Sequence, residues 1–505
     1  MLDAWIAHAI AGLLDLLEQT FTSPFAHQST MVQGVAIVDG AIVDRNPSTG
    51  QVIARVPVST RQDVLDAVER SVAASDAWAA TPLDERIALL RQGCAVLGRS
   101  AGELADRITE EMGKPKAEAA EEAEGAVDKD AFLDLVQKAN ADELLGGDDD
   151  EGPQSLVIRD PLGVVVVISP WNFPSDEILL LALPALAAGN VVIVKPSEVT
   201  PLVGKMTVEA VASALPPNVL QIVQGDGEVG GWLVENDNVD MVAMTGSTAV
   251  GKEIMTSCAK GLKRLVLELG GKDPMIVFAD ADLDLAASDA VEYSLSNTGQ
   301  VCCSFERVYV DSSIKDDFES KVVEMASSYK VGDGRDEENK VGPLVSKLQR
   351  DRVSDQVDAA LKSGAKLLFK SSIPDSAPED ASFYPVTVLG DVEQTNQIQK
   401  AETFGPVISL ATFDGTEEEA IRLANDTEYG LSSAVYTTDS KKATRVAKRI
   451  RSGQVGINCY SINYANTAAP WVGHKNSGYG YHSGMDGWRQ FSVPKSLVFA
   501  SSASM

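Results

Sequence analysis

The sequence predicts an α/β protein with a doubly wound, parallel-sheet nucleotide-binding domain and a second α/β domain. From Val164 onward, apolar runs alternate with helical stretches, as in βαβ units. A second series of this kind starts after Pro274. The 505 residues are 44% apolar and 23% charged, which is typical of a folded chain of two or three domains.

The elements of both series are predicted from the period of their apolar residues. In the first series we expect strands at 164–168, 191–194, 219–223, 240–244 and 264–268, and helices at 176–188, 201–214 and 248–260. In the second series we expect strands at 275–278 and 308–310 and a long helix opening at Asp282. The acidic stretch 142–151 is predicted to be a solvated loop.

Charge and cysteine content exclude several classes of partner. The chain has 43 Lys and Arg against 73 Asp and Glu, a net charge of −30 that would repel nucleic acid or an anionic membrane surface. The densest apolar segment, 178–188, is too short to span a bilayer and contains Pro184. The 5 cysteines fit neither a disulfide framework nor paired zinc-ligand spacing, so we expect no metal site and a reducing, cytoplasmic location.

The first 30 residues are predicted to form an amphipathic helix that docks on the body of the protein. Apolar residues recur there at helical spacing, from Leu2 to Phe21. No Lys or Arg precedes Arg45, which argues against a signal or transit peptide.

Two glycine-rich turns are alternatives for a phosphate site. The segment 225–230 spells G-x-G-x-x-G after a strand, and 246–251 opens the next helix after another strand. Ser247 and Thr248 add hydroxyl donors in the second turn, whereas the carboxylates of the first turn would repel a phosphate. The second turn is therefore favoured, although ordinary tight turns would also explain both matches.

Lys195 to Glu198 follows a predicted strand, at the sheet edge where open α/β folds bind ligands. Glu198 could accept hydrogen bonds from ribose hydroxyls. The alternative is a solvated Lys and a carboxylate that merely begins a helix.

Two residues are candidates for the chemistry itself. Cys302 lies in a turn after Gly299, where a thiol can be exposed and activated, although most lone cysteines only fill space in a core. Glu268 ends a strand before a Gly-Gly turn, where burial could bring its pKa into the range of a general base. By itself it could equally be the partner of a salt bridge.

Taken together and in order, six segments resemble the aldehyde dehydrogenase superfamily. The resemblance extends from about Asn46 to Val498. The segments are Pro170-Trp171-Asn172-Phe173-Pro174, Lys195-Pro196-Ser197-Glu198, Gly246 to Gly251, Leu267-Glu268-Leu269-Gly270-Gly271-Lys272, Gly299 to Cys303, and Glu402-Thr403-Phe404-Gly405-Pro406-Val407.

The resemblance implies a role for each matched residue. Cys302 would be the nucleophile, Glu268 the general base, and Asn172 an oxyanion donor together with the Cys302 backbone N–H. The residues implied for the cofactor are Trp171, Lys195, Ser197, Glu198, Gly225, Gly246, Ser247, Thr248, Gly251, Leu269, Glu402 and Phe404. The implied cofactor is NAD, with NADP as the alternative, because Glu198 would repel a 2′-phosphate.

The chemistry supports these roles. A thiolate that adds to an aldehyde gives a thiohemiacetal, from which a nicotinamide can take a hydride to leave a thioester. An amide donor stabilises the oxyanion, and a carboxylate such as Glu268 activates the water that hydrolyses the thioester to the free acid. The alternatives are a catalytically silent binding protein of the same family, an esterase and a CoA-acylating relative. The silent protein would be favoured if a reacting residue had been lost, and none is.

The sequence departs from the family pattern at three positions. Many relatives have a Lys nine residues after the Asn of the Pro-Trp-Asn segment and a Glu near the C-terminal Ser-Gly turn, a pair proposed to carry the proton of the base outward. Here Leu181 and His482 stand there, with Tyr481 in place of the usual Arg. His482 could take over part of this route, or be an ordinary packed histidine.

The substrate is predicted from three residues of the pocket region. Asp176 and Glu177 follow the Pro-Trp-Asn segment, and Trp471 provides an aromatic wall. Carboxylates beside an aromatic ring suit a cation, which points to amino or trimethylammonio aldehydes. The alternatives are that both acids only favour the helix dipole, and that the substrate is a generic aliphatic aldehyde or a semialdehyde.

The resemblance also implies a small β oligomerisation arm and assembly into a homodimer or homotetramer, since apolar edge strands need covering. The expected divisions are the helix at 1–30, the dinucleotide-binding domain at 31–143 and 162–268, the catalytic domain at 269–474, and oligomerisation strands at 144–161 and 486–505.

Overall fold

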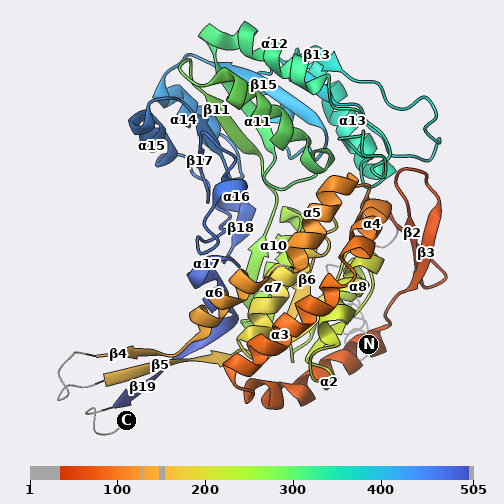
Figure 1. Cartoon of the computed structure of the whole chain (residues 1–505), viewed down its shortest axis with the longest axis vertical. Helices are drawn as coiled ribbons and strands as arrows, with labels where there is room; N and C mark the ends of the chain where they lie inside the picture. Colours follow the sequence, from red (N-terminus) through yellow and green to blue (C-terminus); the bar gives the residue numbers. More distant parts are fainter. Residues whose placement is uncertain (1–33, 128, 147–153, 500–505) are drawn as a thin grey trace, which may run out of the picture.

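A computed structural model describes residues 34–127, 129–146 and 154–499. The helix predicted at 1–30 lies outside the described residues. Two lobes stack along the long axis of the molecule, and a thin β arm projects from the far end of one of them (Figure 1). The predicted α/β fold class is confirmed, whereas the exact domain boundaries stay a prediction.

The first lobe contains a six-stranded sheet in the order β18-β10-β9-β6-β7-β8, parallel except for β18. Its strands are β6 (Val164–Ile168), β7 (Val191–Lys195), β8 (Leu220–Ile222), β9 (Met241–Thr245), β10 (Arg264–Glu268) and β18 (Gly478–Tyr479). The strand residues of β7 and β9 are all buried, as expected for a parallel sheet with helices on both faces.

The helices of this lobe pack around the sheet (Figure 1). They are α2 (Arg61–Ala79), α3 (Leu83–Gly98), α4 (Ala101–Met112), α5 (Lys116–Val127), α6 (Asp130–Asn140), α7 (Asp176–Ala187), α8 (Pro201–Ala212), α9 (Gly227–Glu235) and α10 (Thr248–Cys258), the last followed by a 3-10 turn at Ala259–Gly261. A three-stranded sheet of β1 (Ala36–Val38), β2 (Ala41–Arg45) and β3 (Val52–Pro57) precedes them.

The second lobe is built on a seven-stranded sheet in the order β13-β14-β15-β12-β11-β16-β17. The strands are β11 (Asp273–Val277), β12 (Phe305–Asp311), β13 (Lys366–Lys370), β14 (Thr387–Gly390), β15 (Val407–Phe413), β16 (Ala434–Tyr436) and β17 (Gly456–Ile457). The helices are α11 (Leu283–Leu295), α12 (Lys315–Ala326), α13 (Lys347–Lys362), α14 (Glu417–Asn425), α15 (Ser440–Ala447) and α16 (Ser461–Tyr464). The short helix α17 (Gly484–Trp488) returns to the first lobe, where Trp488 packs edge to face on Phe132 of α6.

The strands and helices predicted for the two α/β series are all present. The largest difference is at the strand predicted at 308–310, which begins at Phe305. The helix predicted to open at Asp282 does so, because the Asp282 carboxylate accepts hydrogen bonds from the backbone N–H groups of Asp284 and Leu285 and so caps the helix.

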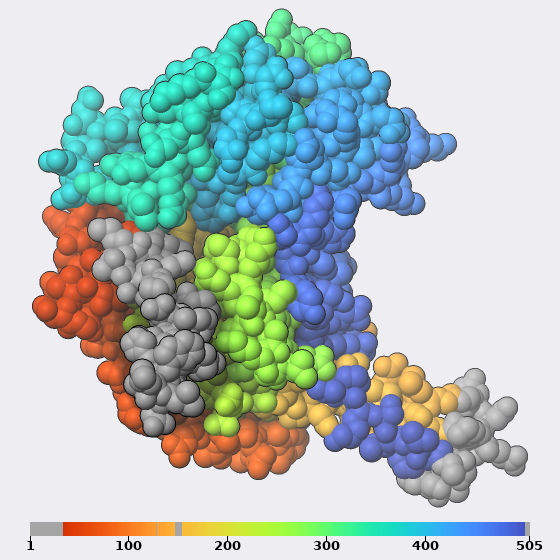
Figure 2. Space-filling model, turned by 180° about the vertical axis from the view of Figure 1, so that it is seen from behind, coloured from red at the N-terminus to blue at the C-terminus, as the bar shows by residue number. Residues whose placement is uncertain are grey.

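The arm is a three-stranded antiparallel sheet in the order β19-β5-β4. Its strands are β4 (Glu143–Leu145), β5 (Gln154–Pro161) and β19 (Ser492–Phe499). Figure 2 shows it standing clear of the body of the molecule. The prediction of a loop over 142–151 is wrong at β4, where Leu144 pairs with Leu156 of β5 despite the surrounding acidic residues.

Candidate active site

A cavity of about 330 Å³ lies where the carboxyl ends of the first lobe's strands face the second lobe. Its walls come from the ends of β6, β7, β9 and β10, from α13, and from the segments around Cys302 and Phe404. Strand ends of this kind form the ligand site of open α/β sheets, so the fold brings most of the predicted residues to one place.

One end of the cavity is polar and lies at the end of β7. The Lys195 ammonium is 3.5 Å from a carboxylate oxygen of Glu198 and also donates to the backbone carbonyls of Pro196 and Gly225. Ser247 caps the N-terminus of α10, whose first turn borders the same space. A helix N-terminus can hold a phosphate, and a carboxylate at a neighbouring strand end can hold the hydroxyls of a ribose.

The cavity collects eight of the twelve residues predicted for the cofactor. Those that line it are Trp171, Lys195, Ser197, Glu198, Gly246, Ser247, Glu402 and Phe404. Gly225, Thr248, Gly251 and Leu269 are not among the lining residues. Gly251 and Leu269 pack together, since a Cβ on that glycine would lie 2.6 Å from the leucine side chain.

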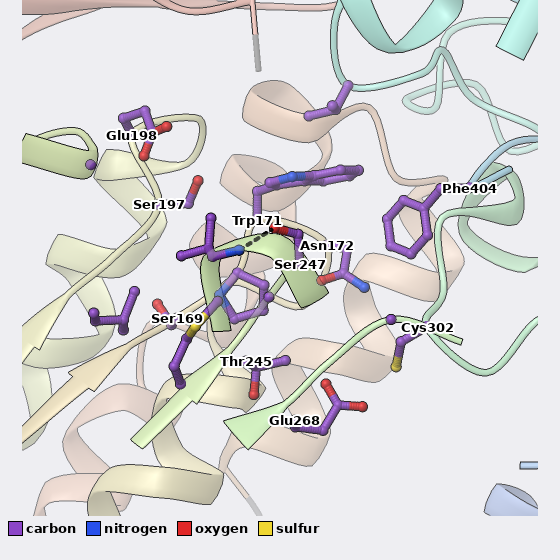
Figure 3. A pocket seen from close by; sticks show the side chains of 18 of the residues that line it. Ser169, Trp171, Asn172, Ser197, Glu198, Thr245, Ser247, Glu268, Cys302 and Phe404 are labelled. Atoms are coloured by element: carbon purple, nitrogen blue, oxygen red, sulfur yellow. Dashed lines mark hydrogen bonds between the residues drawn. The ribbon is translucent and has the colours of Figure 1, made fainter. Parts of the chain in front are cut away.

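Between the two ends, Trp171 and Phe404 meet edge to face, with ring centroids 5.4 Å apart. Phe404 has a left-handed backbone with φ of 55°, and it lies beside Cys302 (Figure 3). Glu402 accepts a hydrogen bond of 2.9 Å from the backbone N–H of Gly271. Burial, reinforced by the charge of Glu306, raises the pKa of Glu402 to about 8.

The opposite end of the cavity is the reactive one. There Figure 3 shows the side chains of Asn172, Glu268 and Cys302 converging. The Asn172 side-chain amide donates to the carbonyl of Gln300 at 3.1 Å, which fixes it against the turn that carries Cys302. The amide's second N–H can therefore point at an oxyanion formed on that sulfur.

Cys302 is partly exposed, while its neighbour Cys303 is buried. The sulfur of Cys303 is turned away to the hydroxyl of Tyr460, at 3.0 Å. Contact with Cys303, burial and the charge of Glu268 raise the pKa of Cys302 well above its usual value. The thiol is therefore neutral at rest and needs a base to react.

Glu268 is buried at the end of β10 and is positioned to be that base. Its carboxylate lies near the Cys302 side chain (Figure 3) and accepts from the indole N–H of Trp471 at 3.4 Å. Burial first, then the charge of Glu177, raises the pKa of Glu268 well above the usual value of a carboxyl. A carboxyl with a raised pKa can take up a proton near neutral pH.

The turn that presents Cys302 depends on backbone that sequence patterns alone do not show. Asn297 and Thr298 both have positive φ, of 50° and 61°, although neither is a glycine. The next residue, Gly299, also has a positive φ, of 71°. Any other residue there would place its Cβ 2.1 Å from the carbonyl oxygen of Gly405. A Cβ on Gly271 would lie equally close to the carbonyl of Cys302, so this glycine admits the turn.

A buried ion pair that the sequence analysis missed holds the segment around Phe404. Lys272 donates to Glu306, whose carboxylate also accepts from the backbone N–H groups of Thr403 and Phe404 at 2.8 and 2.9 Å. The pair ties the turn after β10 to β12 and to the cavity wall. No local spacing signals it, because its members lie on three separate segments.

The two acids predicted for the substrate pocket do not line the cavity. Asp176 is paired with Lys129 at 2.5 Å, and Glu177 accepts from the Thr245 hydroxyl at 2.8 Å. Both are in the first turn of α7, as the dipole interpretation expects. Trp471 lies beside the base rather than facing either acid.

At two of the three positions that depart from the family pattern, Leu181 and His482, the side chains are buried. Leu181 belongs to the apolar core of the first lobe. His482 shares a hydrogen bond of 2.8 Å with the Ser483 hydroxyl. Burial lowers its pKa to about 4, so the imidazole is neutral at physiological pH.

The described residues contain neither a metal-ligand cluster nor a membrane-spanning helix. No group of three or more His, Cys, Asp and Glu side chains in that part of the chain is arranged to hold a metal ion. Among the helices described, none combines the length and apolar character needed to cross a membrane.

With this geometry established, comparison with known proteins identifies the class. The sequence profile of the Aldehyde dehydrogenase family matches residues 37–497, so the chain belongs to that family. It is an oxidoreductase that oxidises aldehydes.

Three relatives show how the chain compares with particular members. Glutarate-semialdehyde dehydrogenase of Pseudomonas putida is 38% identical over 86% of this chain and 89% of the relative. The solved structure of lactaldehyde dehydrogenase from Escherichia coli superposes with a TM-score of 0.86 at 34% identity, covering 92% of this chain and 96% of the other. Betaine aldehyde dehydrogenase of Staphylococcus aureus, solved in complex with NAD+, gives a TM-score of 0.86 at 32% identity over 91% and 92% of the two chains.

Proposed function

We propose that the protein oxidises an aldehyde to the carboxylic acid with NAD(P)+ by way of a covalent adduct on Cys302. One observation carries the proposal: Cys302, Asn172 and Glu268 converge at the end of a cavity whose other end suits a dinucleotide. As the sulfur attacks the carbonyl carbon, Glu268 takes the thiol proton. The Asn172 amide and the Cys302 backbone N–H then bind the oxyanion of the thiohemiacetal.

The residues of the polar end fit a dinucleotide. Lys195 and Glu198 stand where ribose hydroxyls need a donor and an acceptor, and α10 offers its N-terminus to a pyrophosphate. The Ser169 hydroxyl, which lines the cavity, is buried and has no hydrogen-bond partner within the described residues. When bound, NAD(P)+ supplies the hydride acceptor that converts the thiohemiacetal to the thioester. We infer a preference for NAD, because Glu198 would repel a 2′-phosphate.

Glu268 has a second task after the oxidation. A thioester on Cys302 must be hydrolysed, and Glu268, once it has given up the proton taken from the thiol, is placed to deprotonate a water that attacks the same carbon. The carbon–sulfur bond then breaks, the acid leaves, and the sulfur takes a proton back from Glu268, which restores both the thiol and the base. A water-activating carboxyl at this position favours hydrolysis over acyl transfer to another thiol.

For the substrate, we propose neutral or cationic aldehydes, including amino or trimethylammonio aldehydes, in preference to aldehydes that carry a carboxylate. Two carboxyls, Glu177 and Glu268, lie near the thiol, and neither forms a salt bridge within the described part of the chain. The indole of Trp471 stands beside Glu268, and an aromatic ring next to a carboxyl suits a cation. The relatives named above act on substrates of different charge, so the site itself is the basis of this proposal.

Steady-state assays of NADH formation test the charge preference. The probes are betaine aldehyde, butanal and succinic semialdehyde. We expect kcat/KM for succinic semialdehyde to be lower than for butanal by about tenfold or more, because of repulsion by the buried carboxyls. Equal or faster turnover of succinic semialdehyde would refute the charge preference, and no NADH with any aldehyde would refute the activity.

We further propose that the arm joins copies of the chain into a homodimer or a homotetramer. Leu144, Leu145 and Val498 are 55%, 48% and 74% exposed on the strands that the arm projects into solvent. Apolar edge strands of this kind need a partner. Light scattering should give two or four times the 53.6 kDa chain mass, and a monomer at micromolar concentration would contradict the assembly.

A further inference from the structure

Glu177 is a carboxyl beside the reactive end of the cavity that the proposed mechanism does not use. It lies in the first turn of α7, and its carboxylate accepts a hydrogen bond of 2.8 Å from the hydroxyl of Thr245. Thr245 lines the cavity, as Glu268 does. The hydroxyl therefore stands between the cavity and Glu177.

Thr245 and Glu268 are direct neighbours in the sheet. They end β9 and β10, and they are paired in register in this parallel ladder. Paired residues of adjacent parallel strands leave the sheet on the same face, with their backbones about 4.8 Å apart. Figure 3 shows both side chains at the strand ends on the side of Cys302. Glu268 retains one carboxylate oxygen that is buried without a hydrogen-bond partner in the described residues.

We propose that Glu177 is the proton acceptor for Glu268, and that the Thr245 hydroxyl connects the two carboxyls. The inference rests on the proposed function, since it concerns the proton that Glu268 takes from the Cys302 thiol and must lose before it can deprotonate water. That proton passes from Glu268 to the Thr245 oxygen, while the hydroxyl proton of Thr245 passes to Glu177. No net charge is created, and Glu268 returns to its basic form in time for thioester hydrolysis.

The surroundings of Glu177 suit an exchangeable proton. Burial raises its pKa to about 7, against the hydrogen bond from Thr245, which lowers it. Its neighbours from the packed elements are Asp176 on α7, Glu122 on α5, Lys129 before α6, and Glu268 on β10. Lys129 is engaged by Asp176, and Glu122 is engaged by Lys114. Two neighbouring carboxyls whose pKa values are both raised can exchange a proton with each other.

Glu177 acts through Glu268 and does not touch the reacting atoms, so the test needs more than a rate. We would measure the pre-steady-state burst of NADH, the steady-state rate and its pH dependence for Glu177→Gln and Thr245→Val. Glu319→Gln serves as the control, because this carboxyl on α12 is also partly buried with a raised pKa but does not line the cavity.

In Glu177→Gln we expect the burst to remain at one NADH per site while the steady-state rate falls about tenfold or more. The acid limb of the pH profile should move about one unit lower, because loss of a like charge lowers the pKa of Glu268. In Thr245→Val the rate should fall without that downward shift, because the charge of Glu177 remains. Glu319→Gln should behave as the wild type.

Three results would overturn the inference. One is a wild-type steady-state rate and pH profile in Glu177→Gln. Another is an equal loss of burst and steady-state rate with the acid limb in place, which indicates damage to the structure only. The third is a wild-type rate in Thr245→Val. Wild-type protein that forms no NADH would overturn the proposed function itself, and this inference with it.

Discussion

Lys272→Met should both destabilise the protein and weaken cofactor binding. The side chains of Lys272 and Glu306 are 0% and 7% exposed, so the variant leaves a buried carboxylate without its counter-charge. Breaking a buried pair in this way costs about 3–5 kcal/mol of unfolding free energy. Two backbone N–H groups, of Thr403 and Phe404, would still donate to Glu306 but would not neutralise it.

The assay is urea unfolding followed by tryptophan fluorescence, together with NADH titration by fluorescence. Lys272→Met/Glu306→Gln is the matched control, because the amide keeps an acceptor for both N–H groups and carries no charge. It should recover most of the lost stability. Lys321→Met, which removes an exposed ion pair with Asp284, should leave the unfolding midpoint unchanged.

This reasoning would be refuted if Lys272→Met were as stable as the wild type and bound NADH equally well. It would also fail if the double variant were no more stable than the single one, because the loss would then not arise from an uncompensated charge.

Three further predictions concern the reacting residues and the cofactor. Cys302→Ala should abolish both aldehyde oxidation and hydrolysis of p-nitrophenyl acetate. Cys303→Ala should keep most activity in both assays, because the Cys303 sulfur faces Tyr460. The reverse pattern would contradict the assignment of Cys302 as the nucleophile. Glu198→Gln should narrow the preference for NAD over NADP, measured as the ratio of the two kcat/KM values, because the carboxylate that repels the 2′-phosphate is removed. An unchanged ratio would contradict the role of Glu198 in cofactor choice. Because the pKa of Glu268 is raised and only its ionised form is a base, turnover should rise with pH through an acid limb well above 4.5, and a limb at or below 4.5 in the pH–rate profile would be inconsistent with this role.

The sequence predicted the sheet of the first lobe because its strands are short runs of buried apolar residues. Val164–Ile168 is such a run. Its residues are apolar on both faces, as expected for a parallel strand that is covered by helices on both sides. The residue pattern alone missed the strand β4, because the acidic residues around it resemble a solvated loop. Only the family resemblance implied an oligomerisation strand from residue 144, where Leu144 and Leu145 lie on an edge strand of the arm. Charge content does not reveal pairing with a distant strand.

The residues of the candidate site were predictable where they lie in contiguous motifs, as Asn172 and Cys302 do. The partners of the Asp176 and Glu177 side chains were not predictable, because successive residues of a helix point about 100° apart. One acid therefore reaches Lys129 near α6, and the other reaches Thr245 at the sheet. The buried ion pair of Lys272 and Glu306 could not be predicted for a related reason, because it joins segments that are far apart in the chain.

The most direct test of the account is the transient kinetics of Glu268→Gln with NAD and a reactive aldehyde. The amide keeps the shape of the side chain but cannot accept the proton of water. We expect a burst close to one NADH per active site, formed more slowly than in the wild type because the thiol also loses its base, followed by a steady rate about 10²- to 10⁴-fold below that of the wild type. Turnover of Glu268→Gln at the wild-type rate would contradict the assignment of Glu268 as the base that releases the acid from Cys302.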